Sequence, residues 1–244
     1  METNKLFAKR VRSMLLILLV SGLLLQLFAS AIPQGAQIVS NTSETNTPQT
    51  AGSLATAGGT FTTMIINGST QTPRWKAYVG NVTGSLTLDD ATGKSIYDWR
   101  LLTIAGEIYA SRSSAITWTA INCSNRTIIS TEESVMNITT TNADSINKTF
   151  NMSIHKQFYV GGLLMRNSTC PAIATYVNDT RQSASENASF QEVLLTDGTS
   201  MIYSALLEPG LAGFDNGKYN FQMIVAENEY APAPTPYYFY LELS

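Results

Sequence analysis

The sequence predicts a mainly β fold, antiparallel and sandwich-like, with one helical excursion; an α+β fold is the alternative. Two observations lead to this prediction. Short segments in which apolar and polar residues alternate recur along residues 61–244, and turn-forming residues separate them. A helical spacing occurs in one region, where Ile129, Met136, Ala143 and Phe150 recur every seven residues.

Residues 1–31 have the three-part layout of a secretory signal peptide. A basic start is followed by the apolar residues 14–28 and by Ala29-Ser30-Ala31, a small-x-small cleavage site. An uncleaved membrane anchor is the alternative, although the apolar run is near the short end of the ~17–25 residues that span a bilayer. We therefore expect an extracellular or cell-surface protein that begins near Ile32 and touches a membrane only if this segment stays uncleaved.

The charge distribution argues against a nucleic-acid partner. The chain has 15 Lys and Arg and 18 Asp and Glu, of which residues 1–31 contain four basic and one acidic residue. Subtraction leaves 11 basic and 17 acidic residues, a net charge of −6. These 11 cations are not clustered, whereas neutralisation of phosphates requires clustered cations.

The number of N-glycosylation sequons is far above chance. Residues 32–244 contain 16 Asn, and 49 of these 213 residues are Ser or Thr. Chance placement, 16 × 49/213, gives about four matches to Asn-x-Ser/Thr. The sequence has eleven: Asn41, Asn67, Asn81, Asn122, Asn125, Asn137, Asn147, Asn151, Asn167, Asn178 and Asn187. This density predicts an N-glycosylated surface; a merely Asn- and Thr-rich β protein is the alternative.

The sequons stop after Asn187. The later residues Asn216, Asn220 and Asn228 have no Ser or Thr two positions further on. Because a glycan needs an exposed site, we expect the C-terminal part either to be mostly buried or to face a partner subunit.

The strands are expected in one domain, residues 61–244, which follows a flexible Ser/Thr-rich stalk at residues 32–60. The stretch from Trp75 to Trp99 reads as a hairpin with aromatic residues at both ends and a turn at residues 89–93. A second hairpin is expected where Asp197-Gly198 separates two apolar runs. The expected strands are 61–66, 82–88, 95–99, 107–110, 115–121, 174–177, 190–195, 201–207, 219–225 and 237–243.

The helical insert is expected at about residues 129–151. Ser130 with Glu133 three residues later has the pattern of a capping box. One continuous helix would place Asn147 only about 20° around the axis from Met136, on the face that packs against the core. We therefore expect a break near residues 139–142; the alternative is that Asn147 carries no glycan.

The two cysteines, Cys123 and Cys170, bracket this insert. Two cysteines in an exported protein more often pair than stay free, so we predict a disulfide; one buried and one exposed thiol is the alternative. These residues match no zinc or haem pattern, and we expect no metal or other cofactor.

Candidates for catalysis are few, and we expect no enzyme. The one histidine, His155, lies beside Lys156 in a stretch that reads as solvent-exposed. The carboxylates Asp89, Asp90, Asp98 and Glu107 could supply the pair that a glycosidase needs, but Asp89-Asp90 lies in a turn, where aspartate is common. A secreted hydrolase using Asp98 and Glu107 is therefore the third alternative for function.

Four aromatic residues could form a ligand face. Trp75, Tyr78, Tyr97 and Trp99 are of the type that stacks on sugars, although aromatic residues in a β protein more often belong to the core.

Several motifs resemble a family of uncharacterised secreted archaeal surface glycoproteins. They are Trp75-x-x-Tyr-Val-Gly-Asn-Val-Thr-Gly-x-Leu-Thr-Leu-Asp, Ile-Tyr-Asp-Trp99, Gly106-Glu-Ile-Tyr-Ala-Ser111, Cys123, Phe190-Gln-Glu-Val-Leu-Leu, Gly213-Phe-Asp, Tyr219-Asn-Phe-Gln-Met and the closing Tyr-Phe-Tyr-x-Glu-Leu. The resemblance covers most of residues 61–243. It implies an archaeal cell envelope and no established activity.

These observations together predict a structural protein of a cell surface or filament that acts through interaction. Its expected partners are other envelope proteins, or further copies of itself bound through the C-terminal strands that lack sequons. An adhesin or carbohydrate-binding module is the alternative.

Overall fold

The computed structural model describes residues 32–244, and the expected signal peptide lies outside the described residues. The protein is mainly β, with 31% strand and 8% helix. All strand pairs in the described chain are antiparallel. The predicted fold class, mainly β with one helical excursion, is confirmed.

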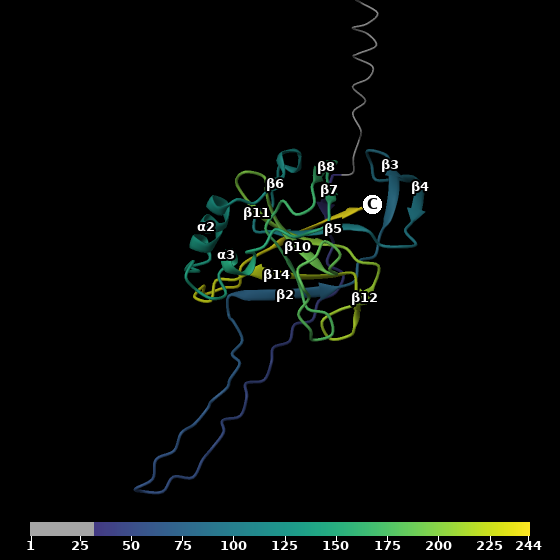
Figure 1. Ribbon diagram of the computed structural model, residues 1–244. Coiled ribbons are helices and arrows are strands. Elements are labelled where there is room, and N and C mark those ends of the chain that lie inside the picture. The colour runs from purple at the N-terminus through teal and green to yellow at the C-terminus, as the bar shows by residue number, and fades with distance from the viewer. Residues whose placement is uncertain (1–31) are drawn as a thin grey trace, which may run out of the picture. The chain divides into compact units, whose positions relative to one another are not determined.

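A seven-stranded sheet forms the centre of the fold (Figure 1). The strand order is β1 (Gln34–Gly35), β15 (Tyr238–Leu243), β5 (Gly106–Ser111), β11 (Met201–Leu206), β10 (Gln191–Thr196) and β6 (Asn122–Cys123), and β9 (Ala172–Ala174) also pairs with β10. The first and last strands of the described chain are therefore neighbours.

The two central strands are buried along their whole length, because each face of the sheet is covered by a hydrophobic cluster. On β10, Val193 and Leu195 belong to one cluster and Leu194 to the other. Successive side chains of a strand point to opposite faces. A strand with both faces buried is often a continuous apolar run, but in β10 only Val193, Leu194 and Leu195 form one. The other three residues of the strand are buried polar side chains: Gln191, Glu192 and Thr196.

A second β layer covers one face of the sheet. It consists of β2 (Trp75–Gly80) and β14 (Phe221–Ala226), which pair along six residues. Met223 and Val225 of β14 are buried in the same cluster as Leu194 and Tyr203 of the central strands. The cluster thus lies between two β layers.

Two helices close the end of this cluster: α2 (Arg126–Val135) and α3 (Ile146–Thr149). The predicted break between them is confirmed, and the core-facing residues Ile129, Met136, Ile146 and Phe150 are buried. The predicted capping box is wrong. The helix begins earlier, because the side chain of Asn125 caps it by accepting a hydrogen bond from the Ile128 N–H at 3.0 Å.

The remaining strands form three short hairpins: β3 (Ser85–Asp89) with β4 (Ser95–Arg100), β7 (Phe158–Val160) with β8 (Leu163–Met165), and β12 (Leu211–Ala212) with β13 (Lys218–Tyr219). The hairpin around Asp197-Gly198 is confirmed as β10–β11. The hairpin expected from Trp75 to Trp99 is confirmed only around its turn, as β3–β4; its Trp75 end is wrong, because Trp75–Gly80 is a separate strand, β2, that pairs with β14.

Two expected strands are absent from the described chain, and a third, expected at 174–177, lies earlier as β9 (Ala172–Ala174). Residues 115–121 contain a 3₁₀ turn, η1 (Trp118–Ala120), which places the Trp118 ring 5.1 Å from the rings of both Tyr109 and Tyr240. Residues 61–66 are exposed and have no strand partner within residues 32–244, although their composition favours a strand.

Residues 36–72 form a long exposed loop instead of a terminal stalk. The loop begins where the Ala36 N–H donates to the carbonyl of Phe239 at 2.9 Å, and it ends beside β2. Figure 1 shows its two arms leaving the β layers and returning to them. The expected stalk, residues 32–60, therefore includes a strand of the central sheet, β1.

Candidate interaction surface

The four aromatic residues of the expected ligand face lie in two different places. Trp75 and Tyr78 belong to β2 and pack against the core, with the Trp75 ring 6.1 Å from Phe150. Tyr97 and Trp99 belong to β4 and are 60% and 49% exposed. Only the second pair is available to an external ligand.

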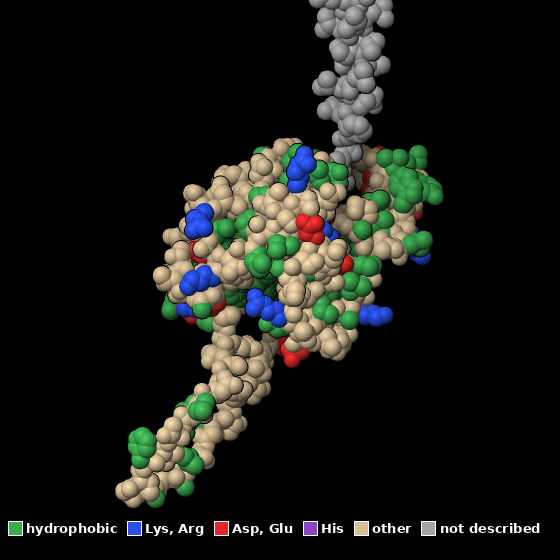
Figure 2. Space-filling view, in the orientation of Figure 1, with side chains coloured by type: hydrophobic (Ala, Val, Ile, Leu, Met, Phe, Trp, Pro, Cys, Tyr) green, Lys and Arg blue, Asp and Glu red, His purple; other side chains and the backbone are tan. Residues whose placement is uncertain are grey.

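The β3–β4 hairpin carries the more exposed pair on an apolar surface. Its register places Leu88 opposite Tyr97. The Tyr97 and Trp99 rings contact each other edge to face, with their ring centroids 4.9 Å apart. Leu88 is also exposed on this face, and Ile96 is exposed on the other face of the hairpin. Figure 2 shows hydrophobic side chains gathered on this hairpin. Large exposed apolar patches on soluble domains mark surfaces that bind other molecules.

The Asp89-Asp90 pair stabilises the turn of this hairpin. The Asp90 carboxylate accepts hydrogen bonds from the N–H groups of Thr92 and Lys94 at 2.8 and 2.9 Å. These hydrogen bonds lower the pKa of Asp90, and the bond from the Lys94 N–H has the largest effect. The turn interpretation is therefore confirmed for Asp90, whereas Asp89 is the last residue of β3 and accepts a hydrogen bond from the Ser95 hydroxyl at 2.5 Å.

The β2–β14 ribbon has one edge closed by side chains of the central sheet. The Ile224 N–H of β14 donates to Glu192 Oε2 at 2.9 Å, and the Ala226 N–H donates to the hydroxyl of Tyr203 at 3.4 Å. Both amides therefore point away from β2. Glu192 and Tyr203 come from β10 and β11, so the outer edge of β14 faces the body of the protein.

The other edge of the ribbon, on β2, is open. In an antiparallel ladder, directly opposite residues exchange both hydrogen bonds or neither. Ala77 lies opposite Ile224 and Trp75 opposite Ala226, so the N–H and C=O groups of Ala77, Trp75 and, by alternation, Val79 point outward. Within residues 32–244, β14 is the only strand paired with β2, and Val79 is 41% exposed.

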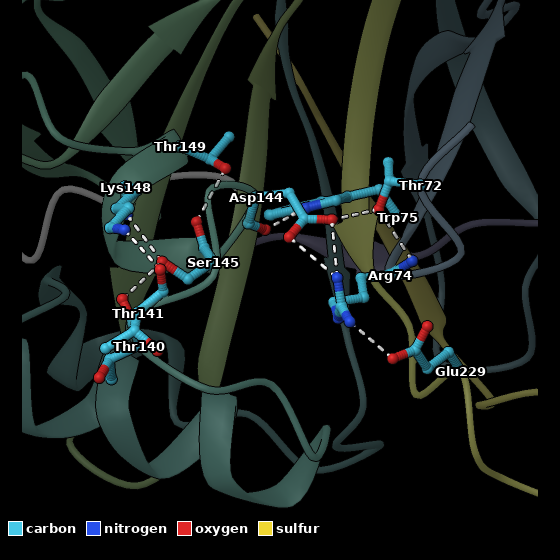
Figure 3. Close-up of polar contacts among 10 residues, drawn as sticks. All are labelled: Thr72, Arg74, Trp75, Thr140, Thr141, Asp144, Ser145, Lys148, Thr149 and Glu229. Atoms are coloured by element: carbon cyan, nitrogen blue, oxygen red, sulfur yellow. Dashed lines mark hydrogen bonds and ion pairs between the residues drawn. The ribbon is translucent and has the colours of Figure 1, made fainter. Parts of the chain in front are cut away.

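An ion-pair network fixes the start of β2 (Figure 3). Arg74 donates to both carboxylate oxygens of Asp144 at 3.1 and 3.2 Å and to Glu229 at 2.7 Å. Thr72 also hydrogen-bonds Asp144, and Trp75 Nε1 donates to the Asp144 carbonyl at 2.7 Å. The network joins β2 to the loop before α3 and to the loop after β14.

The carboxylates considered for a hydrolase are not brought together. Asp98 is exposed on β4, whereas Glu107 is buried on β5 in the central sheet. The carboxylate opposite Glu107 is Glu242 of β15, and burial together with this neighbour raises the pKa of Glu107 to about 8. Glu242 was not among the predicted site residues, although its position in the sequence gives one signal. Glu242 lies two residues after Tyr240, so both side chains lie on the same face of the strand.

Glu242 is held by donors from two segments. The hydroxyl of Tyr109 donates to it at 3.0 Å, and the Gly161 N–H donates to both of its carboxylate oxygens at 3.0 Å. Burial raises its pKa. With 6% of Glu242 exposed, the pair is a buried element of the sheet and not an open catalytic cleft.

The expectation that His155 is solvent-exposed is wrong. Its side chain is fully buried. Nδ1 lies 2.8 Å from the carbonyl of Lys156, and Nε2 accepts hydrogen bonds from the N–H groups of Thr169 and Cys170 at 3.1 and 3.0 Å. Nδ1 is therefore the protonated nitrogen of a neutral ring, and burial lowers the pKa of His155.

The predicted disulfide is present between Cys123 and Cys170, with the two Cα atoms 4.8 Å apart. Cys123 lies on β6, and Cys170 precedes β9, so the bond joins two segments on the same side of β10.

The asparagines of the sequons lie almost entirely on the surface. Ten of the eleven are exposed, and Asn147 is the half-buried exception. Asn147 is also the sequon asparagine that one continuous helix would place on the face packed against the core. In the strands after Asn187, by contrast, every residue of β10 and β11 is buried. Burial within the chain, one of the two expected alternatives, thus holds for β10 and β11, whereas residues 227–240 are exposed or half-buried.

Within residues 32–244, no group of three or more His, Cys, Asp or Glu side chains could hold a metal ion. None of the helices in these residues is long and apolar enough to cross a bilayer.

Comparison with known proteins finds no match to this chain among family models, curated proteins or solved structures.

Proposed function

We propose that this is an exported, N-glycosylated structural protein of a cell surface or filament, which acts through contacts with other envelope proteins or with copies of itself. The observation that carries the proposal is the placement of the sequons. Ten of eleven sequon asparagines are exposed, whereas the five other asparagines of residues 32–244 include the buried Asn220 and the half-buried Asn142 and Asn228.

Two further features support the proposal. The Cys123–Cys170 disulfide is of the kind that persists in an oxidising, extracellular compartment. The β3–β4 hairpin presents apolar side chains to the outside, as interaction surfaces do. The resemblance to secreted archaeal glycoproteins points to the same setting.

The test is peptide-level mass spectrometry of the protein isolated from the native envelope and from the medium. We expect an N-terminus near Ile32 and glycans on most of the exposed sequon asparagines, with Asn147 occupied least. An intact N-terminus with unmodified asparagines would refute the export and glycosylation part of the proposal. Absence from isolated envelopes would refute the structural part.

Carbohydrate binding is the second candidate function, and one observation favours it. Tyr97 and Trp99 are exposed and in contact on β4, as a stacking platform for a sugar ring requires. A glycan array with the Trp99→Ala variant tests this candidate. Ile96→Ala is the matched control, because Ile96 lies on the same strand with its side chain on the opposite face. Equal signals from both variants and the unmodified protein would refute it.

A further inference from the structure

Residues 61–66 have the composition of a strand but no strand partner within residues 32–244. The segment reads Phe-Thr-Thr-Met-Ile-Ile and contains no charge, proline or glycine. Phe61 is 93% exposed, Ile65 99% and Ile66 83%. Short, uncharged segments of high β propensity readily add to other strands when they are exposed. The protein thus holds a strand-forming segment outside its own sheets.

The loop that carries this segment presents it away from the body. The two arms of the loop are joined near their base, where Thr45 Oγ1 donates to Gln71 Oε1 at 3.4 Å. The base itself is fixed, because Thr72 and Arg74 both bind Asp144. Residues 61–66 lie beyond this contact, on the returning arm (Figure 1).

The open edge of β2 fits such a segment. β2 has six residues, the same number as the segment, and its outward backbone groups at Trp75, Ala77 and Val79 have no strand partner in residues 32–244. β2 has one charged side chain, Lys76, and its Nζ lies 5.9 Å from the ring centroid of Tyr78.

Other edges are less suitable acceptors. The outer edge of β14 faces Glu192 and Tyr203, and the outer edge of β15 is partly covered by β1. β4 carries two charged side chains, Asp98 and Arg100, whereas β2 carries only Lys76. Charged side chains on edge strands oppose the addition of another strand.

We propose that residues 61–66 of one copy add as an extra strand to the open edge of β2 in a second copy of this chain. The inference deepens the proposed structural function, on which it rests, by naming the contact between copies. Each copy has one such segment and one such edge at different places, so the contact is head-to-tail and can continue from copy to copy. The sequons Asn67 and Asn81 follow the two segments directly, so neither asparagine lies within the paired residues.

The first test measures association by light scattering over a range of concentrations, with variants expressed and processed in the native host. Unmodified protein should form dimers and longer assemblies. Ile65→Lys should weaken association roughly tenfold or more, because a charge then enters an apolar strand contact. Leu102→Lys is the matched control, since Leu102 is 98% exposed, as Ile65 is, but lies in the loop between β4 and β5. Monomeric unmodified protein, or equal association of both variants, would overturn the inference.

The second test identifies the acceptor by disulfide crosslinking. Copies with Met64→Cys are mixed with copies with Ala77→Cys, and a crosslinked pair is expected. Leu102→Cys, at another exposed position, replaces Ala77→Cys in the control. In a single chain carrying both Met64→Cys and Ala77→Cys, a concentration-independent internal crosslink would show that the segment pairs with its own β2, which overturns the inference. None of these outcomes alters sequon occupancy, which tests the proposed function separately.

Discussion

His155 depends on backbone groups distant in sequence. Nε2 accepts from the amides of Thr169 and Cys170, which follow it by 14 and 15 residues. The residues near His155 in the sequence do not indicate this contact. Lys156 and the neighbouring sequons instead suggest an exposed segment. Burial produced by a distant segment is the kind of feature that a local pattern cannot reveal.

Replacement of His155 should therefore destabilise the fold. In His155→Ala, two buried amides lose their acceptor, and we expect the free energy of unfolding to fall by about 2–4 kcal/mol. Chemical denaturation at neutral pH measures the change. Gln157→Ala, at an exposed position two residues away, is the control and should have little effect. Similar losses in both variants would contradict the role of the imidazole.

Glu192 should make the stability of the protein depend on pH. Burial raises its pKa far above the usual value, so the folded state keeps a proton that the unfolded state has lost. The unfolding free energy therefore falls as pH rises above the unfolded pKa of about 4.3. Glu192→Gln removes this proton linkage. Between the unfolded pKa and the raised folded pKa, the variant should lose stability less steeply, by about 1.4 kcal/mol per pH unit. Equal slopes in the variant and the unmodified protein would show that Glu192 is ionised when folded.

At the scale of elements, Asn125 combines two roles that can be separated. It caps α2, and it is also the first residue of a sequon completed by Thr127. Asn125→Ala should lower the free energy of unfolding by about 1 kcal/mol through loss of the cap. Thr127→Ala removes the sequon and leaves the cap, so a smaller effect is expected in thermal denaturation. Ser130→Ala should change nothing measurable; a loss as large as that of Asn125→Ala would restore the capping box expected from the sequence.

Elements with a local signal could be predicted, and elements set by distant contacts could not. Asp197-Gly198 between two apolar runs was enough to predict the β10–β11 hairpin. Residues 61–66 carry an equally good strand signal, but propensity does not say whether a partner exists. The prediction of a single aromatic ligand face was wrong for a similar reason. The sequence indicates which residues are aromatic, whereas the strand to which β2 pairs decides that Trp75 packs against the core.

At the scale of the whole molecule, the disulfide limits the freedom of the unfolded chain. The two cysteines are 47 residues apart, and closing a loop of this length stabilises the fold by about 4 kcal/mol in the chain-entropy model. The Cys123→Ser, Cys170→Ser double variant should lose stability of this order. Denaturation with and without reductant measures it. The double variant should not respond to reductant, and an unmodified protein that also fails to respond would contradict this contribution.

The pairing of β1 with β15 has a consequence for the timing of folding. Gln34 lies opposite Leu241, and Gly35 opposite Tyr240. During synthesis, residue 34 leaves the ribosome long before residue 241. β5 also pairs with β15 along its whole length, so this pairing forms only after residues 238–243 have been made. The central sheet therefore cannot close while the chain is still emerging.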